Sequence, residues 1–141
     1  PARVKTACAA LVPAAAALLA LGASPSRPDA AMAEQGRVTY VRYCVSCHGP
    51  AGQADGPLAR DLAVAVPDLT TLAARSGGSY PEARVRRIID HGEKLRGHGT
   101  ADMPAWGDAF KKTAGIAAPT VEDAIRNLTH YIWSLQQDQK K

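Results

Sequence analysis

Five consecutive residues, Cys44–Val45–Ser46–Cys47–His48, decide the fold expected of this 141-residue chain. Their pattern is C-x-x-C-H, the sequence at which c-type haem is attached. Residues i and i+3 lie on the same side of a helical turn, so both thiols can meet the two vinyl groups along one edge of a haem. The next residue, His48, is placed to reach the iron. The motif therefore predicts one covalent haem c, with thioethers from Cys44 and Cys47 and with His48 as an axial ligand.

Three other readings of the two cysteines stay open. The pair could form a C-x-x-C disulfide in an oxidising compartment, or half of a zinc site completed by His91 or His98, or it could occur by chance. A redox C-x-x-C normally lies in a βαβ setting, which this sequence lacks. A structural zinc site normally has a second close pair of ligands, whereas His91 and His98 are well separated in a Gly-containing loop. Haem is therefore the favoured reading.

Residues 1–33 have the features of an export signal. Arg3 and Lys5 precede a short Ala/Leu-rich apolar stretch, and Ala31–Met32–Ala33 provides an Ala-x-Ala cleavage pattern. We expect cleavage after Ala33, so that residues 34–141 form the mature domain in the periplasm. The alternatives are a disordered tail or an uncleaved anchor, and only a retained segment 1–33 would associate the protein with a membrane.

The composition favours a small cofactor-filled domain. The chain length allows one domain, and only 1 Phe, 2 Trp and 4 Tyr are available for a core. A covalent haem would replace the missing apolar bulk. The net charge of +4 comes without a basic run that interleaves with aromatic residues, so we expect no nucleic-acid partner. A multi-pass membrane protein and a large multidomain enzyme are excluded.

The second axial ligand is expected to be Met103, the single methionine of the predicted mature domain. It precedes a proline in a loop, and the chain between His48 and Met103 is long enough to pass around a haem and return on its far side. A His/Met pair raises the potential of a haem and suits it to electron transfer. The rivals are His91, His98 and His130, and we expect His130 at the surface.

The periodicity of the mature part predicts an all-α fold of about four to five short helices wrapped round one covalent haem. Residues 49–67 and 91–105 are expected as loops, the first with one helical turn around Leu58–Leu62. The predicted helices run from near Gln35 into the cysteines, from Leu69 to Arg75 after an Asp68 cap, from Pro81 to Asp90, and from Thr120 onward.

Apolar side chains near these segments are candidate walls of the haem pocket, although each could equally be ordinary core: Tyr43, Leu69, Leu72, Ile88, Ile89 and Trp106. Three arginines, Arg84, Arg86 and Arg87, are candidates to pair with a haem propionate. A solvated helix face is the better interpretation of these three residues.

These features together resemble the class I c-type cytochromes, the small bacterial monohaem electron carriers, over most of residues 36–136. In that family a glycine and an aromatic residue four positions later pack the first helix against the last one. Gly36 and Tyr40 match these positions, and Leu128 and Tyr131 match their partners.

The family also has a Gly-Pro pair shortly after the haem histidine. Gly56–Pro57 matches it, so the resemblance implies that the Pro57 carbonyl accepts the imidazole N–H of His48 and fixes the ring. A proline after the methionine, as in Met103–Pro104, resembles a bacterial branch of the family.

The resemblance implies a periplasmic one-electron carrier rather than an enzyme, with unidentified redox proteins as donor and acceptor. If both axial positions are filled by protein, no coordination site is left for a substrate. Two alternatives stay open: a haem-based sensor or gas-binding module with an open sixth site, and a haem subunit of a dehydrogenase or oxidase complex.

Overall fold

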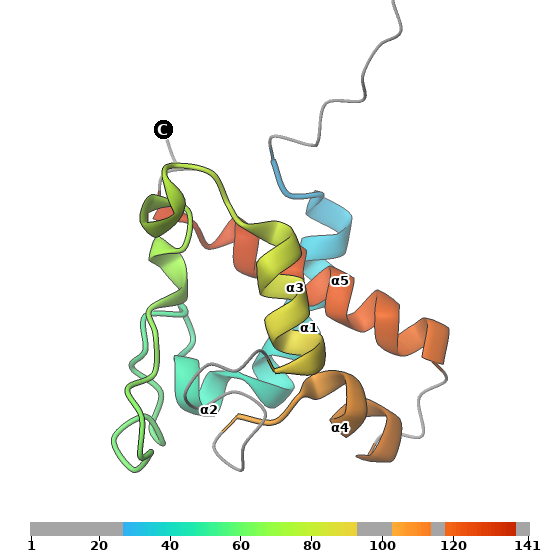
Figure 1. Ribbon diagram of the computed structural model, residues 1–141, viewed down its shortest axis with the longest axis horizontal. Helices are drawn as coiled ribbons and strands as arrows, with labels where there is room; N and C mark the ends of the chain where they lie inside the picture. Colours follow the sequence, from blue (N-terminus) through green and yellow to red (C-terminus); the bar gives the residue numbers. More distant parts are fainter. Residues whose placement is uncertain (1–26, 93–102, 114–117, 138–141) are drawn as a thin grey trace, which may run out of the picture.

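The structure, a computed structural model, describes residues 27–92, 103–113 and 118–137, which fold as helices joined by loops (Figure 1). The helices are α1 (Ala30–Tyr43), α2 (Val45–His48), α3 (Glu82–His91), α4 (Trp106–Thr113) and α5 (Ala118–Ser134), with 3-10 segments η1 (Leu69–Thr71) and η2 (Ala74–Ser76). Within these ranges there is no β-sheet, which confirms the predicted all-α fold. No helix in the described ranges has both the length and the apolarity needed to cross a membrane.

The most extensive helix contact in the described ranges is the crossing of α1 over α5. Gly36 lies at the crossing point, where a Cβ atom would stand only 2.0 Å from the carbonyl oxygen of Asn127. Tyr40 follows one turn later and packs on Tyr131, with ring centroids 5.0 Å apart. The predicted packing of these positions between the first and last helices is confirmed.

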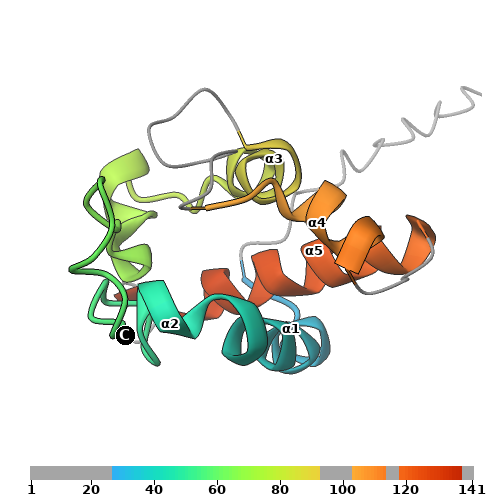
Figure 2. The same ribbon diagram turned by 90° about the horizontal axis from the view of Figure 1, so that it is seen from below.

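The helices surround one core. Figure 2 shows α3 and α4 on one side of the molecule and α1 and α2 on the other, with α5 between them. Their inward side chains form a single apolar cluster of Tyr40, Cys44, Val85, Ile89, Phe110, Val121, Ile125, Leu128 and Ile132.

The loop after α2 folds back on the C-x-x-C-H turn. The Leu58 N–H donates to the Ser46 carbonyl at 2.9 Å, and the Ala54 N–H donates to the His48 carbonyl at 3.0 Å. Leu69 closes the loop by donating its N–H to the Gly52 carbonyl at 2.7 Å. Residues 58–62 form turns rather than the predicted helical turn, since the loop satisfies its backbone groups against α2.

Helix boundaries differ from the expectations in several places, and α5 begins at Ala118 instead of Thr120. α1 begins at Ala30 instead of near Gln35, because the Asp29 carboxylate caps it by accepting from the Met32 N–H at 2.8 Å. α4 was not predicted, since a short helix gives too short a periodic pattern; it is fixed by packing of the 2%-exposed Phe110. α3 is displaced from its predicted bounds by one residue at each end.

The segment predicted as one helix from Leu69 to Arg75 forms η1 and η2 instead. Asp68 caps it as expected, accepting from the Thr70 N–H at 2.8 Å. In a continuous α-helix the Ala73 N–H would bond the Leu69 carbonyl. Here the buried Gln136 amide stands between them, accepting from Ala73 at 2.9 Å and donating to Leu69 at 2.8 Å. A side chain just after the C-terminal end of α5 therefore replaces a helical bond.

Candidate functional site

A cavity of about 240 Å³ lies between α1, α3 and α5 and the η1–η2 segment. Its lining is mainly apolar, and five of the six predicted wall residues line it: Leu69, Leu72, Ile88, Ile89 and Trp106. The sixth, Tyr43, is not among the lining residues and instead packs on Trp106 at 5.4 Å. Close-packed interiors rarely leave voids larger than a water molecule, and a cavity smaller than this one can already hold benzene. The cavity is therefore large enough to be a candidate ligand site.

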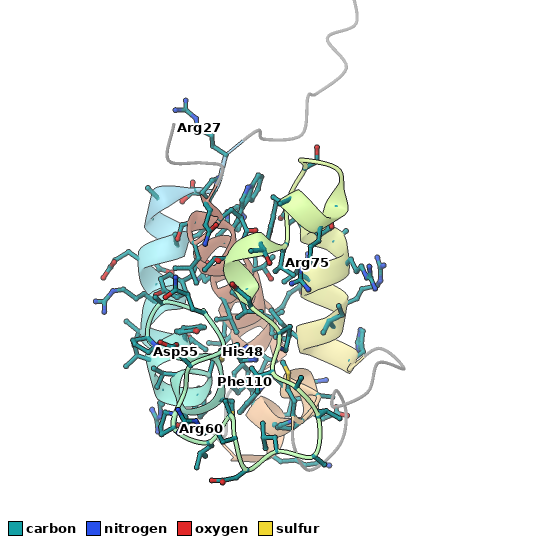
Figure 3. The ribbon with its side chains drawn as sticks, turned by 90° about the vertical axis from the view of Figure 1, so that its left-hand side faces the viewer. Arg27, His48, Asp55, Arg60, Arg75 and Phe110 are labelled. Carbon is teal, nitrogen blue, oxygen red and sulfur yellow. The ribbon has the colours of Figure 1, made fainter. Side chains whose placement is uncertain are left out.

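The C-x-x-C-H motif faces this cavity with side chains from one face of consecutive helical turns. Tyr40, Cys44 and His48 follow one another at four-residue spacing along α1 and α2, and all three line the cavity. Tyr40 is fully buried, and its hydroxyl donates to the Gly49 carbonyl at 2.7 Å. In Figure 3 the His48 side chain extends from α2 into the interior of the molecule. Tyr40 is a site residue that the sequence analysis assigned only to helix packing.

Met103 reaches the same cavity from the segment that leads into α4. Of its predicted rivals, His91 is exposed at the end of α3 and is not among the lining residues, while His98 lies outside the described residues. Within the described ranges, the structure thus brings the imidazole of His48 and the side-chain sulfur of Met103, which are far apart in the sequence, to the same cavity.

His130, the third rival, is not at the surface, and that expectation was wrong. Its side chain is buried, with the residue only 6% exposed. Its Nδ1 accepts from the Asp29 backbone N–H at 2.9 Å, and its Nε2 lies 3.7 Å from a Glu82 carboxylate oxygen. Two partners distant in sequence, at the starts of α1 and α3, make this residue a tertiary contact that the α5 pattern alone does not reveal.

Two predicted site residues stand outside the cavity lining. Cys47 is half-buried, and Pro57 is exposed in the loop after α2. The loop nevertheless contacts the motif directly, because a Cβ atom on Gly56 would lie 2.5 Å from the Ser46 carbonyl oxygen and 2.6 Å from that of Cys47. Only a glycine fits there, which explains the Gly of the Gly-Pro pair.

The two cysteines are free thiols, so no disulfide joins them. Burial raises the pKa of the Cys44 thiol to about 12, and the nearby Cys47 adds to the shift. The Cys44 sulfur is therefore an uncharged wall atom at neutral pH. In the described parts of the chain, no group of three or more His, Cys, Asp and Glu side chains is arranged to hold a metal ion.

The three candidate arginines of α3 separate in the structure. Arg84 lines the cavity, whereas Arg86 pairs with Glu122 of α5 at 2.6 Å and Arg87 is not among the lining residues. A further arginine, Arg75 of η2, also lines the cavity. Arg75 was not predicted as a site residue, because only the fold of η1 and η2 turns this segment towards α3.

The cavity and its donors fit the predicted haem. An apolar space suits a flat porphyrin, and the buried sulfur of Cys44 stands at its wall. His48 and Met103 also line the cavity, and they carry nitrogen and sulfur donors of the kinds that haem iron takes as axial ligands. The fit rests on side chains from three separate parts of the chain.

Comparison with known proteins agrees with this arrangement. The family model described as cytochrome C oxidase, cbb3-type, subunit III, matches residues 31–118, which is more than half of the chain. No curated protein matches the chain. The chain therefore belongs to this family of c-type cytochromes, which carry covalently bound haem c and serve in electron transfer.

Proposed function

We propose that this cytochrome is a periplasmic one-electron carrier of the class I type, with a single haem c in the cavity. In this proposal Cys44 and Cys47 hold the haem through thioethers, and His48 and Met103 are its axial ligands. The observation that carries the proposal is the convergence of Cys44, His48 and Met103 on one apolar cavity.

When bound, haem c supplies an iron that gains and loses one electron. The residues of this chain then have two tasks. Leu69, Leu72 and Ile89 exclude water from the ring, and a dry pocket together with a methionine ligand raises the potential. Tyr40 holds the Gly49 carbonyl directly after His48, so the histidine is fixed within a short, hydrogen-bonded turn.

Pro57 is proposed as the residue that orients His48. Its carbonyl would accept the imidazole N–H and so fix the ring and its tautomer. The close contact of Gly56 with the backbone of Ser46 and Cys47 supports this role, because it holds the loop against the motif.

The domain division is also part of the proposal. Residues 1–33 act as the export signal and residues 34–141 as the haem domain, with membrane association only where the first segment is retained. Redox proteins in the same compartment are the donor and the acceptor.

The mass of the exported protein tests the proposal most directly. We expect the mass of one haem above that of the polypeptide, and a haem stain that survives denaturation. Replacement of Cys44 by Ala should weaken attachment, and replacement of His48 should abolish normal ligation. Colourless protein with two thiols that react with an alkylating reagent would contradict the proposal.

Met103 separates a carrier from a haem-based sensor. The oxidised carrier should show the near-infrared band of a Met–iron bond and should not bind carbon monoxide readily. Met103→Ala should lose this band and gain carbon monoxide binding. If the unchanged protein already binds carbon monoxide at once and lacks the band, the sensor reading replaces the carrier.

The family match favours one further candidate, a haem subunit of an oxidase complex. The native size of the protein extracted in mild detergent distinguishes the two. A free carrier elutes as a small monomer, whereas a subunit elutes with a large complex that oxidises a reduced cytochrome.

A further inference from the structure

The cleavage site expected for the export signal lies inside a folded helix. The Ala31–Met32–Ala33 pattern falls in the first turn of α1, and the expected cut separates Ala33 from Glu34. In an α-helix each carbonyl accepts from the N–H four residues later, so the carbonyl at the cut is held within the helix. Ala33 itself is only 8% exposed. The bond to be cut is therefore helical, and the residue before it is packed against the protein.

Asp29 closes this turn with three hydrogen bonds. Its carboxylate accepts from the Met32 N–H at 2.8 Å, and its carbonyl accepts from the Ala33 N–H at 2.9 Å. Its own backbone N–H donates to Nδ1 of the buried His130 at 2.9 Å. Asp29 thus caps the turn and ties it to α5.

The chain after the cut is also held on α5, which α1 crosses (Figure 1). The Gln35 side-chain oxygen accepts from the Asn127 side-chain amide at 2.8 Å. Gly36 lies so close to the Asn127 carbonyl oxygen that an added Cβ would stand 2.0 Å from it. Residues on both sides of the cut therefore contact α5, and the turn leaves α5 only if these contacts break.

A folded segment of this kind is a poor protease substrate. Proteases cut exposed, open segments, and they reach a folded one only through local opening. Where opening is fast relative to cleavage, the rate follows the population of the open form. Here opening costs the cap, the bond to His130 and the packing of Ala33. The folded domain therefore slows cleavage at its own signal site.

We propose that the folded haem domain protects the cleavage site of its export signal, so that the cut after Ala33 takes place only before α1 packs on α5. The cut is a hydrolysis: water is added across the Ala33–Glu34 peptide bond, which leaves a carboxylate on Ala33 and an amine on Glu34. This inference rests on the proposed function, because it takes over the division at residue 33.

The order of cleavage and folding then determines where the protein is found. A chain that is cut first becomes the free periplasmic carrier. A chain that folds first keeps residues 1–33 and stays attached to the membrane. One sequence thus supplies a free form and a membrane-bound form of the same haem domain.

Digestion of the haem-loaded chain of residues 1–141 by a purified bacterial signal peptidase in detergent tests the protection. Mass spectrometry measures the fraction that is cut after Ala33. A peptide of residues 1–40 is the unprotected substrate, since it has the whole signal but lacks α5, and short isolated helices are marginal in water. We expect the folded chain to be cut at least about tenfold more slowly than the peptide.

Two substitutions weaken the protection from opposite sides. Asp29→Ala removes the cap and His130→Ala removes the acceptor on α5, and each should raise the cleavage rate of the folded chain about fivefold. Since His130 is far from the cut in sequence, its effect cannot come from recognition of the signal. Asp29→Asn keeps a capping side chain and His91→Ala removes an exposed histidine of α3, so both should leave the rate unchanged.

The outcomes separate this inference from the proposed function. If the folded chain and the peptide are cut after Ala33 at the same rate, the protection is wrong while the carrier stands. If the peptide itself is not cut after Ala33, the division at residue 33 is wrong and this inference falls with it. Covalent haem is measured separately by its mass, so neither result bears on electron transfer.

Discussion

Gly36 is a residue at which the two longest described helices, α1 and α5, approach each other closely. The α5 backbone lies where its side chain would be, with the Asn127 carbonyl oxygen at 2.0 Å and the Leu128 nitrogen at 2.8 Å from an added Cβ. Backbone atoms cannot rotate away as a flexible side chain can. A methyl group at this position must therefore push the helices apart.

We predict that Gly36→Ala destabilises the haem-loaded protein by about 1–3 kcal/mol, the usual cost of overpacking. Urea titration measures it. Gly77→Ala is the comparison, because Gly77 has open space within 4 Å but a positive φ of 74°. It should cost about 1 kcal/mol for the left-handed backbone alone and leave the Tyr40–Tyr131 contact intact. Equal stability of Gly36→Ala and the unchanged protein would contradict the close approach.

At the scale of elements, Gln136 determines the shape of the cavity wall. It is fully buried, and besides its bonds to Ala73 and Leu69 it donates to the Ile132 carbonyl at 2.8 Å. By standing between the Ala73 N–H and the Leu69 carbonyl, it joins the η1–η2 segment to α5. The positions of the lining residues Leu69 and Leu72 depend on these hydrogen bonds of Gln136.

Gln136→Ala should leave the Ala73 N–H and the Leu69 carbonyl without their amide partner. A buried polar group that loses its hydrogen-bond partner costs about 1–3 kcal/mol. We therefore predict that the free energy of unfolding falls by roughly that amount or more. Gln137→Ala is the matched control, since Gln137 is exposed and makes one bond, to Thr70. It should stay within about 0.5 kcal/mol of the unchanged protein. A similar loss of unfolding free energy in both variants would argue against a stabilising role of the Gln136 amide.

The start of α1 is the second element with a testable consequence. Asp29 caps the helix with its carboxylate and donates its backbone N–H to His130, whereas the predicted cleavage site lies after Ala33. Cleavage there would remove the cap and the first helical turn.

We predict that a haem-loaded protein that begins at Glu34 is less stable than one that begins at Arg27, by about 1–3 kcal/mol. A lost N-cap costs about 1 kcal/mol, and the lost hydrogen bond to His130 a similar amount. Melting temperatures of the two proteins measure the difference. Asp29→Ala in the longer protein removes the cap alone and should fall between them; identical melting temperatures would contradict the contribution of this turn.

For the whole molecule, buried tyrosines limit stability at alkaline pH. Burial raises the pKa of Tyr40 and of Tyr80 above the usual value near 10. The unfolded chain therefore releases these protons first. The stabilisation from the neutral phenols is intact below about pH 10 and is lost as the pH rises above it.

We predict that Tyr80→Phe lowers the free energy of unfolding by about 1 kcal/mol at pH 7, because the bond to the Thr129 carbonyl is lost. Above about pH 10 its stability should decline less steeply with pH than that of the unchanged protein. Urea titrations from pH 7 to 11 measure both slopes, and the range from pH 7 to 8 serves as internal control. Parallel curves over the whole range would contradict the prediction.

Sequence patterns predicted the elements with local causes. The Asp68 cap follows from residue type and position, and the family resemblance implied the α1–α5 packing of Gly36 and Tyr40; both are confirmed. The haem motif is also local, since its two cysteines and its histidine all lie between Cys44 and His48. Two of the expectations that failed had causes distant in sequence: the burial of His130 and the division of the Leu69–Arg75 helix.

The sequence by itself determined that this is a small all-α c-type cytochrome, because the attachment motif and the helix periodicity are short-range patterns. Only the tertiary structure decided which of the candidate ligands and arginines reach the cavity. Met103, Arg75 and Arg84 meet His48 there because α1, α3 and α5 pack around one centre. Such convergence depends on the crossing of helices and on side chains such as Gln136, whose partners Ala73 and Leu69 are distant in the sequence.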